Sequence, residues 1–178
     1  MPTFTAIDFE TLPGEHGPEP AEFALVVFNT EGEILHFFEA ALPVNKIYAA
    51  SPACRDSLVS AWPELKPWLQ DAILVGHNIG YDTALLYKCF PALQVERCID
   101  TLDVARKTYP RTFDDYSLTA LLESFDLLEQ VGAMKLNDHY EPHRALYDSV
   151  ACALLTLQLL NQPKGRELIL PPIQGSLF

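Results

Sequence analysis

The chain has 178 residues, of which 49% are hydrophobic and 20% charged, a composition typical of one globular domain with a sizeable core. Twelve Lys and Arg against twenty-four Asp and Glu give a net charge of −12, which argues against a broad basic surface for nucleic acid. No apolar run is long enough to cross a membrane, and the chain begins directly with a strand-like segment. We therefore expect a cytoplasmic protein without a signal peptide or a membrane partner.

The four cysteines are Cys54, Cys89, Cys98 and Cys152, and no two of them form a C-x-x-C pair. This spacing argues against a thiolate zinc site and against a redox motif. We expect all four to be reduced residues of the core.

The first 41 residues predict three strands. Residues 3–10 alternate between apolar and polar side chains. Residues 12–22 hold three prolines, two glycines and three glutamates, which predict a polar surface loop. Residues 23–29 and 33–41 predict two strands joined by a turn at Glu31-Gly32, so all three strands should pair as a meander.

The rest of the chain predicts strands that alternate with helices. Residues 52–69 are helical, with interruptions at Pro63 and Pro67. Short apolar runs predict buried strands at 72–75 and 95–99, and helices are predicted at 81–90, 102–109 and 117–125. A loop over 127–141 precedes Pro142, which opens a last long helix to about residue 161.

Prolines at 163, 171 and 172 favour an extended tail after this helix. The sequence therefore divides into a domain over residues 1–161 and a tail over residues 162–178. A meander followed by alternating strands and helices indicates an α/β fold with a mixed sheet.

Acidic residues stand inside otherwise apolar segments at three places. Asp8 and Glu10 share one face of the first strand, with their Cα atoms about 7 Å apart. Asp82 and Asp148 lie on the apolar stripes of their helices, so both should point inward. Burying carboxylates is costly unless a cation compensates them, so their convergence predicts a divalent-metal site. Oxygen ligands favour Mg²⁺ or Mn²⁺, and two ions would serve the attacking water and the leaving oxygen of a phosphodiester.

His143 precedes the last of these acids by five residues, in a loop or the first turn of the last helix. An imidazole that titrates near neutrality fits a general base for the attacking water. Each motif alone is more typical of a solvated strand end or a helix cap. Their combination, in this order, favours a hydrolytic site.

Three segments resemble the motifs of the DEDD-type 3′→5′ exonucleases of the histidine subclass (DEDDh), within the DnaQ-like and exonuclease X-like superfamily. The segments are Ile7-Asp8-Phe9-Glu10-Thr11, His77-Asn78-Ile79-Gly80-Tyr81-Asp82 and His143-Arg144-Ala145-Leu146-Tyr147-Asp148. The resemblance covers about residues 3–160. It implies a ribonuclease-H-like fold, with a five-stranded mixed sheet flanked by helices.

The resemblance also implies a role for each motif. The four acids would bind two Mg²⁺ or Mn²⁺, with Asp82 acting through water, and His143 would be the base. The product would be a nucleoside 5′-monophosphate from a 3′ end. Residues expected to contact the terminal nucleotide are Thr11, Leu12, His77 and Asn78. The sequence departs from the family pattern where Pro13 opens an acidic segment and where Tyr81 replaces the usual Phe.

The last six residues, Ile173-Gln174-Gly175-Ser176-Leu177-Phe178, resemble the bacterial sliding-clamp-binding peptide Gln-x-x-Leu-Phe. Gln174 offers an amide for hydrogen bonding, and Leu177 and Phe178 offer apolar anchors for a hydrophobic groove. The alternative is a tail that docks these hydrophobic residues on its own domain. Clamp tethering would supply affinity that the acidic charge does not.

The leading hypothesis is a metal-dependent DNA 3′→5′ exonuclease that works in repair or proofreading. A second is an RNA or oligoribonucleotide 3′→5′ exonuclease, because carboxylates and histidine do not read the sugar. A third is a non-catalytic module that binds a clamp and a polymerase, and a fourth is the exonuclease subunit of a larger assembly. The clamp-like tail favours DNA as the substrate.

Overall fold

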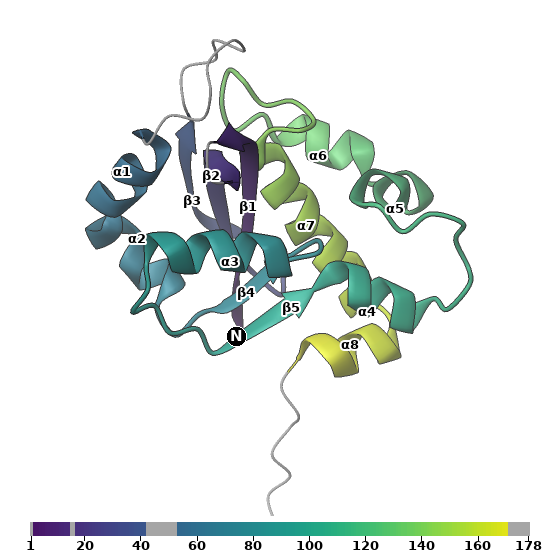
Figure 1. The fold of residues 1–178 in the computed structure, drawn as a ribbon. Coiled ribbons are helices and arrows are strands. Elements are labelled where there is room, and N and C mark those ends of the chain that lie inside the picture. Colours follow the sequence, from purple (N-terminus) through teal and green to yellow (C-terminus); the bar gives the residue numbers. More distant parts are fainter. Residues whose placement is uncertain (1, 15–16, 42–52, 171–178) are drawn as a thin grey trace, which may run out of the picture.

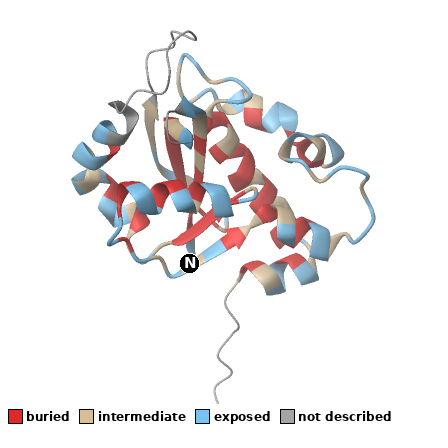
Figure 2. Ribbon diagram, viewed as in Figure 1, coloured by how far each residue is buried: buried red, intermediate tan, exposed pale blue. Residues whose placement is uncertain are grey.

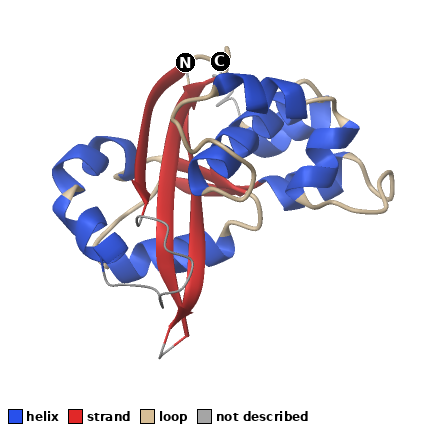
Figure 3. Ribbon diagram, turned by 90° about the horizontal axis from the view of Figure 1, so that it is seen from above, coloured by secondary structure: helices blue, strands red, loops and turns tan. Residues whose placement is uncertain are grey.

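The structure is a computed structural model that describes residues 2–14, 17–41 and 53–170. Five strands form one sheet in the order β3-β2-β1-β4-β5, with helices on both faces (Figures 1 and 3). The strands β1 (Thr3–Gly14), β2 (Gly17–Asn29) and β3 (Ile34–Ala41) form an antiparallel meander. The strands β4 (Ile73–Gly76) and β5 (Arg97–Asp100) run parallel to β1. The predicted meander and five-stranded mixed sheet are confirmed.

The two faces of the sheet bury alternate residues of β1. Ile7 and Phe9 pack against α1 (Ala53–Ser60), α2 (Trp62–Leu69) and α3 (Gly80–Cys89). Phe4 and Ala6 face the other layer, which contains α4 (Thr101–Thr108), α5 (Leu118–Ser124), α6 (Leu128–Met134), α7 (Ala145–Leu160) and α8 (Pro163–Ile169). Because α7 lies between the sheet and the outer helices, most of its residues are buried (Figure 2).

The prediction of a loop over residues 12–22 is wrong. β1 and β2 continue as a two-stranded ribbon, in which Pro13 pairs with Pro18 and Gly14 with Gly17. Its prolines lie beyond the parts of these strands that pair with β3 and β4, where a missing amide costs no ladder hydrogen bond. Gly17 has φ = 113°, a conformation that glycine adopts without strain.

The helices after residue 52 agree with the sequence in most places. The break between α1 and α2 comes just before Pro63, as predicted, but Pro67 lies inside α2 without ending it. The strands β4 and β5 and the helices α3, α4 and α5 are confirmed with ends shifted by one or two residues.

Three expectations near the end of the chain are wrong. The predicted loop over 127–141 contains α6, which buries Val131 against the α7 layer. α7 begins at Ala145 and not at Pro142. The expected extended segment contains α8, whose first turn accommodates Pro163, and Gly165 lets this helix approach the end of α7.

The cysteines agree only in part with the expectation that all of them lie in the core. Cys89 and Cys152 are buried as expected, but Cys98 is exposed because it lies on the edge strand β5. Cys54 and the clamp-like residues Gln174, Leu177 and Phe178 lie outside the residues whose side chains are described.

The division of the chain at residue 161 stays a prediction. Within the described ranges, none of the helices is long and apolar enough to span a membrane.

Candidate active site

Asp8 and Glu10 lie on the face of β1 that α7 covers. They pair across the sheet with Ala24 and Glu22 of β2, so all four residues are on the same face. A register shift follows directly between Glu10 and Thr11. The two carboxylates therefore stand at the point where the covered sheet gives way to the projecting β1–β2 ribbon (Figure 3).

Asp148 reaches the same place from the first turn of α7. The hydroxyl of the next residue, Ser149, donates to the carbonyl of Ala24 at 3.3 Å and holds this turn against β2. Asp8, Glu10 and Asp148 each bring one carboxylate oxygen within 4.8 Å of the others. The predicted convergence of these three acids is thus present in the structure.

Asp82 approaches from the opposite layer, in the first turn of α3. Its Oδ1 accepts a hydrogen bond from the backbone amide of Phe9 at 2.9 Å. Phe9 lies beyond Ala6, the last residue of β1 that pairs with β4, so Asp82 supplies the acceptor that a longer β4 would have supplied. This places a fourth carboxylate beside Asp8.

These acids carry more negative charge than their surroundings neutralise. Burial, followed by the charges of Asp82, Asp148 and Glu10, raises the pKa of Asp8 to about 9. Burial, followed by Asp148 and Glu22, raises the pKa of Glu10 to about 7. Burial raises the pKa values of Asp82 and Asp148 to about 6 each. A partly buried, oxygen-only donor set with this excess charge fits hard divalent cations such as Mg²⁺ or Mn²⁺.

His143 lies in the loop just before α7, as expected, and its backbone has φ = 62°. Its charge lowers the pKa of Glu10 and of Asp148, against the effect of burial. Its backbone amide also hydrogen-bonds the carboxylate of Asp148. The structure therefore brings His143 to the edge of the carboxylate cluster.

Sequence reasoning missed a buried ion pair beside the cluster. Arg144 Nε donates to Glu22 Oε2 at 2.8 Å, and each side chain is 12% exposed. Glu22 was assigned to a surface loop, which hid its register with Glu10. Alternation continued back from residue 23 would have placed Glu22 on the same face of β2 as Ala24, and the β1–β2 register then brings it beside Glu10.

Of the residues expected at the nucleotide, Thr11 and Leu12 follow Glu10 on the ribbon. The hydroxyl of Tyr81, in the first turn of α3, donates to Thr11 Oγ1 at 3.3 Å. Leu12 and Tyr81 are both exposed. The hydroxyl of Tyr81, which phenylalanine lacks, therefore connects the second motif to the first.

The imidazole of His77 makes internal hydrogen bonds through both nitrogens. Nε2 donates to the carbonyl of Tyr116 at 2.9 Å, and Nδ1 lies 2.9 Å from the hydroxyl oxygen of Thr101, which also donates to the carbonyl of Gly76 at 3.2 Å. Asn78 is exposed, and its backbone amide donates to Asp100 Oδ1 at 2.9 Å. His77 joins β4 to α4 and to the loop before α5, whereas the Asn78 side chain faces outward.

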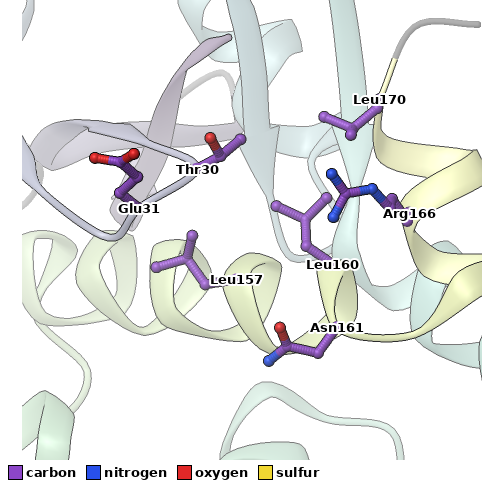
Figure 4. A pocket seen from close by; sticks show the side chains of 7 residues that line it. All are labelled: Thr30, Glu31, Leu157, Leu160, Asn161, Arg166 and Leu170. Carbon is purple, nitrogen blue, oxygen red and sulfur yellow. The ribbon is translucent and has the colours of Figure 1, made fainter. Parts of the chain in front are cut away.

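A separate cavity of about 260 Å³ lies at the other end of α7 (Figure 4). Its lining residues are Thr30, Glu31, Leu157, Leu160, Asn161, Arg166 and Leu170. They come from the β2–β3 turn, the end of α7 and α8, so this cavity is distinct from the carboxylate cluster.

Three solved structures have the same fold as this chain, and the names of two of them identify exonucleases. Escherichia coli exonuclease I in complex with a dA16 oligonucleotide matches 95% of this chain and 42% of that chain, with 16% identity and a TM-score of 0.61. A 3′-exonuclease that recognises the histone mRNA stem-loop matches 89% of this chain over 81% of its own length, with 18% identity and a TM-score of 0.57. Schizosaccharomyces pombe Pop2p with bound Mg²⁺ and Mn²⁺ matches 91% of this chain over 84% of its own length, with 11% identity and a TM-score of 0.63. These likenesses confirm the predicted ribonuclease-H-like fold.

Curated relatives are much longer than this chain. The PolC-type DNA polymerase III of Bacillus subtilis is 31% identical over 146 residues, which are 73% of this chain and 9% of the relative. The PolC-type polymerase of Listeria welshimeri is 28% identical over 148 residues, 75% of this chain and 10% of the relative. This chain therefore matches about a tenth of each of these polymerases.

The profile of the RNase_T exonuclease family matches residues 5–156, which span β1 through most of α7 and include all four clustered acids and His143. The chain belongs to the RNase_T exonuclease family.

Proposed function

We propose that this chain is a metal-dependent 3′→5′ exonuclease of the DEDDh type that releases nucleoside 5′-monophosphates from DNA. The observation that carries the proposal is the meeting of Asp8, Glu10 and Asp148 within 4.8 Å, with Asp82 and His143 beside them. Family membership supports an exonuclease. The geometry adds the residues that would perform the reaction.

Asp8, Glu10, Asp82 and Asp148 would hold the cations. When bound, two Mg²⁺ or Mn²⁺ ions supply Lewis-acid polarisation of water and stabilise negative charge at the phosphate. Three of the acids share one face of the site, and Asp82 faces them from the other layer. They would therefore hold the ions between β1 and the first turns of α3 and α7.

His143 would act as the general base. It takes a proton from the attacking water as the new phosphorus–oxygen bond forms, and the bond from phosphorus to the 3′ oxygen of the penultimate nucleotide breaks. The departing 3′ oxygen gains a proton from solvent water, and the released nucleotide keeps its 5′ phosphate. Thr11, Leu12 and Asn78 would contact the terminal nucleotide, and His77 would support the site through its hydrogen bonds to Thr101 and Tyr116.

DNA is the proposed substrate because the two relatives compared above are DNA polymerases. The neighbours of known structure include one with a DNA oligonucleotide and one that acts on histone mRNA. The fold alone therefore does not choose the sugar, and a repair or proofreading role follows only if DNA is cut. RNA cleavage is the competing outcome.

The test is degradation of 5′-labelled and 3′-labelled DNA and RNA single strands with Mg²⁺ or Mn²⁺. The wild type should shorten 5′-labelled DNA stepwise and release labelled mononucleotide from 3′-labelled DNA, whereas Asp8→Ala should do neither. Glu167→Gln, on the exposed face of α8, is the matched control and should retain activity. Intact DNA and RNA under every condition would overturn the exonuclease proposal and favour a non-catalytic module.

We also propose that Gln174, Leu177 and Phe178 bind a bacterial sliding clamp. The support is the sequence match to Gln-x-x-Leu-Phe alone. A triple alanine variant at these positions should lose binding to the immobilised clamp and retain cleavage of short oligonucleotides. Equal clamp binding by the variant and the wild type would exclude this role.

A further inference from the structure

Glu22 contacts the two residues that follow His143, one through its side chain and one through its backbone. Its Oε2 accepts from Arg144 Nε at 2.8 Å and from the backbone amide of Ala145 at 3.4 Å. Ala145 is the first residue of α7, and an acceptor there satisfies an amide that has no partner within the helix. Glu22 thus fixes both the residue after His143 and the start of the helix that carries Asp148.

Glu22 is itself fixed by the sheet. It pairs with Glu10 on β1 and with Ala41 on β3, so strands lie on both sides of its backbone. The next residue, Phe23, is fully buried and packs against Phe9 with ring centroids 4.5 Å apart. The ion pair therefore connects the loop before α7 to a rigid part of the molecule.

The backbone between this pair and the cluster is constrained. His143 has φ = 62°, a left-handed conformation that residues with a Cβ seldom adopt unless their surroundings impose it. Its amide bonds the carboxylate of Asp148, and the amide of Asp148 donates to the carbonyl of Arg144 at 3.0 Å. Contacts on both sides of His143 thus hold it in this conformation.

We propose that the Glu22–Arg144 ion pair positions His143, by fixing the backbone that carries its imidazole at the edge of the carboxylate cluster. This inference rests on the proposed function, because it assigns Arg144 a role in the same reaction. Arg144 is a positioning residue here, with its Nε committed to Glu22 and its side chain only 12% exposed. Its removal should therefore lower the rate of cleavage more than it weakens substrate binding.

A double-mutant cycle with His143 tests the inference. Single-turnover cleavage of 5′-labelled DNA is measured at saturating enzyme for wild type, Arg144→Gln, His143→Ala and the double variant. Arg144→Gln should slow cleavage about tenfold or more in the wild-type background and less than about twofold when His143 is alanine. Glu167→Gln, which removes an exposed ion pair with Lys164, should leave both rates unchanged.

An equal loss in both backgrounds would overturn the proposal, because Arg144 would then act independently of His143. A thermal melt of each variant checks folding. If Arg144→Gln does not melt cooperatively, Arg144→Lys takes its place in the cycle, since it keeps the charge beside Glu22 but lacks the planar guanidinium. A loss confined to the background that contains His143 supports the proposal with either variant.

A second readout needs no catalysis. In the metal-free protein, the Cε1–H resonance of His143 is identified by its absence from the NMR spectrum of His143→Ala. This resonance should shift or split in Arg144→Gln and stay in place in Glu167→Gln, and an unmoved resonance in both would overturn the proposal. If the wild type cuts neither DNA nor RNA, the proposed function fails, while this spectrum still decides whether Arg144 positions His143.

Discussion

The carboxylate of Asp82 accepts a hydrogen bond from the backbone amide of Phe9, and Phe9 lies between Asp8 and Glu10 on the same strand. One acid of the cluster therefore also completes the hydrogen bonding of the strand that carries two others. The contact joins α3 to β1 across 73 positions of sequence. A substitution at Asp82 thus affects both the charge of the site and the stability of β1.

Two substitutions at Asp82 should separate these effects. Asp82→Asn keeps an oxygen that can accept from Phe9 but removes the charge, so exonuclease activity should fall by about 10²-fold or more while the fold is retained. Asp82→Ala also leaves the Phe9 amide without its acceptor and should lower the free energy of unfolding by about 1–3 kcal/mol. Urea unfolding in EDTA measures the difference, and equal stability of the two variants would contradict it.

The metal-free protein should lose stability as the pH rises. The pKa of Asp8 is raised to about 9 in the folded protein, so the folded state binds more protons than the unfolded state between about pH 4 and pH 9. The stabilisation is complete below the unfolded pKa and is lost as the pH rises through the folded one. Melting temperatures in EDTA should therefore fall across this window.

Asp8→Asn is the control for this pH dependence, because it removes the titrating group and should flatten the fall. Mg²⁺ should raise the melting temperature of the wild type, and by more at pH 8 than at pH 6, since the ion replaces protons on the carboxylates. The same rise in Asp8→Asn would show that Mg²⁺ binds elsewhere.

Alternation along β1 predicted that Asp8 and Glu10 share a face, and the apolar stripes of two helices predicted that Asp82 and Asp148 point inward. These features are local, because the period of a strand or helix sets side-chain direction. The meander was predicted for the same reason, since the turn at Glu31-Gly32 stands between two clearly alternating runs.

The features that the sequence did not reveal depend on distant partners. Residues 12–22 have the composition of a loop, but pairing between β1 and β2 makes residues 12–14 and 17–22 strand. Glu22 and Arg144 are 122 positions apart, and only the fold brings them together. α6 and α8 have seven residues each, too few for a clear helical period, and are stabilised by packing against α7.

Tyr81→Phe should weaken substrate binding without slowing cleavage of bound substrate. The substitution removes the 3.3 Å hydrogen bond to Thr11, the residue that follows Glu10, but keeps the ring. We expect KM for single-stranded DNA to rise about two- to tenfold, kcat to change less than twofold, and stability to change by less than about 0.5 kcal/mol. Tyr87→Phe, at an exposed position of the same helix, should change neither constant. A fall in kcat at constant KM would place Tyr81 in the chemical step instead.

His77→Gln should destabilise the protein, and by less at low pH. The wild-type imidazole hydrogen-bonds Tyr116 and Thr101, so its loss should cost about 1–3 kcal/mol near pH 7.5. Burial lowers the pKa of His77 in the folded protein, so the unfolded state binds the proton more readily. The stability that neutral His77 contributes is therefore lost as the pH falls through the unfolded pKa of about 6.5. The difference in unfolding free energy between wild type and variant, measured by urea titration in EDTA, should therefore shrink between pH 7.5 and pH 5.5. His139→Gln, at an exposed position, is the control and should have the stability of the wild type at every pH. If the difference in unfolding free energy between wild type and His77→Gln does not change with pH, the imidazole is already protonated or its two hydrogen bonds do not depend on the neutral form.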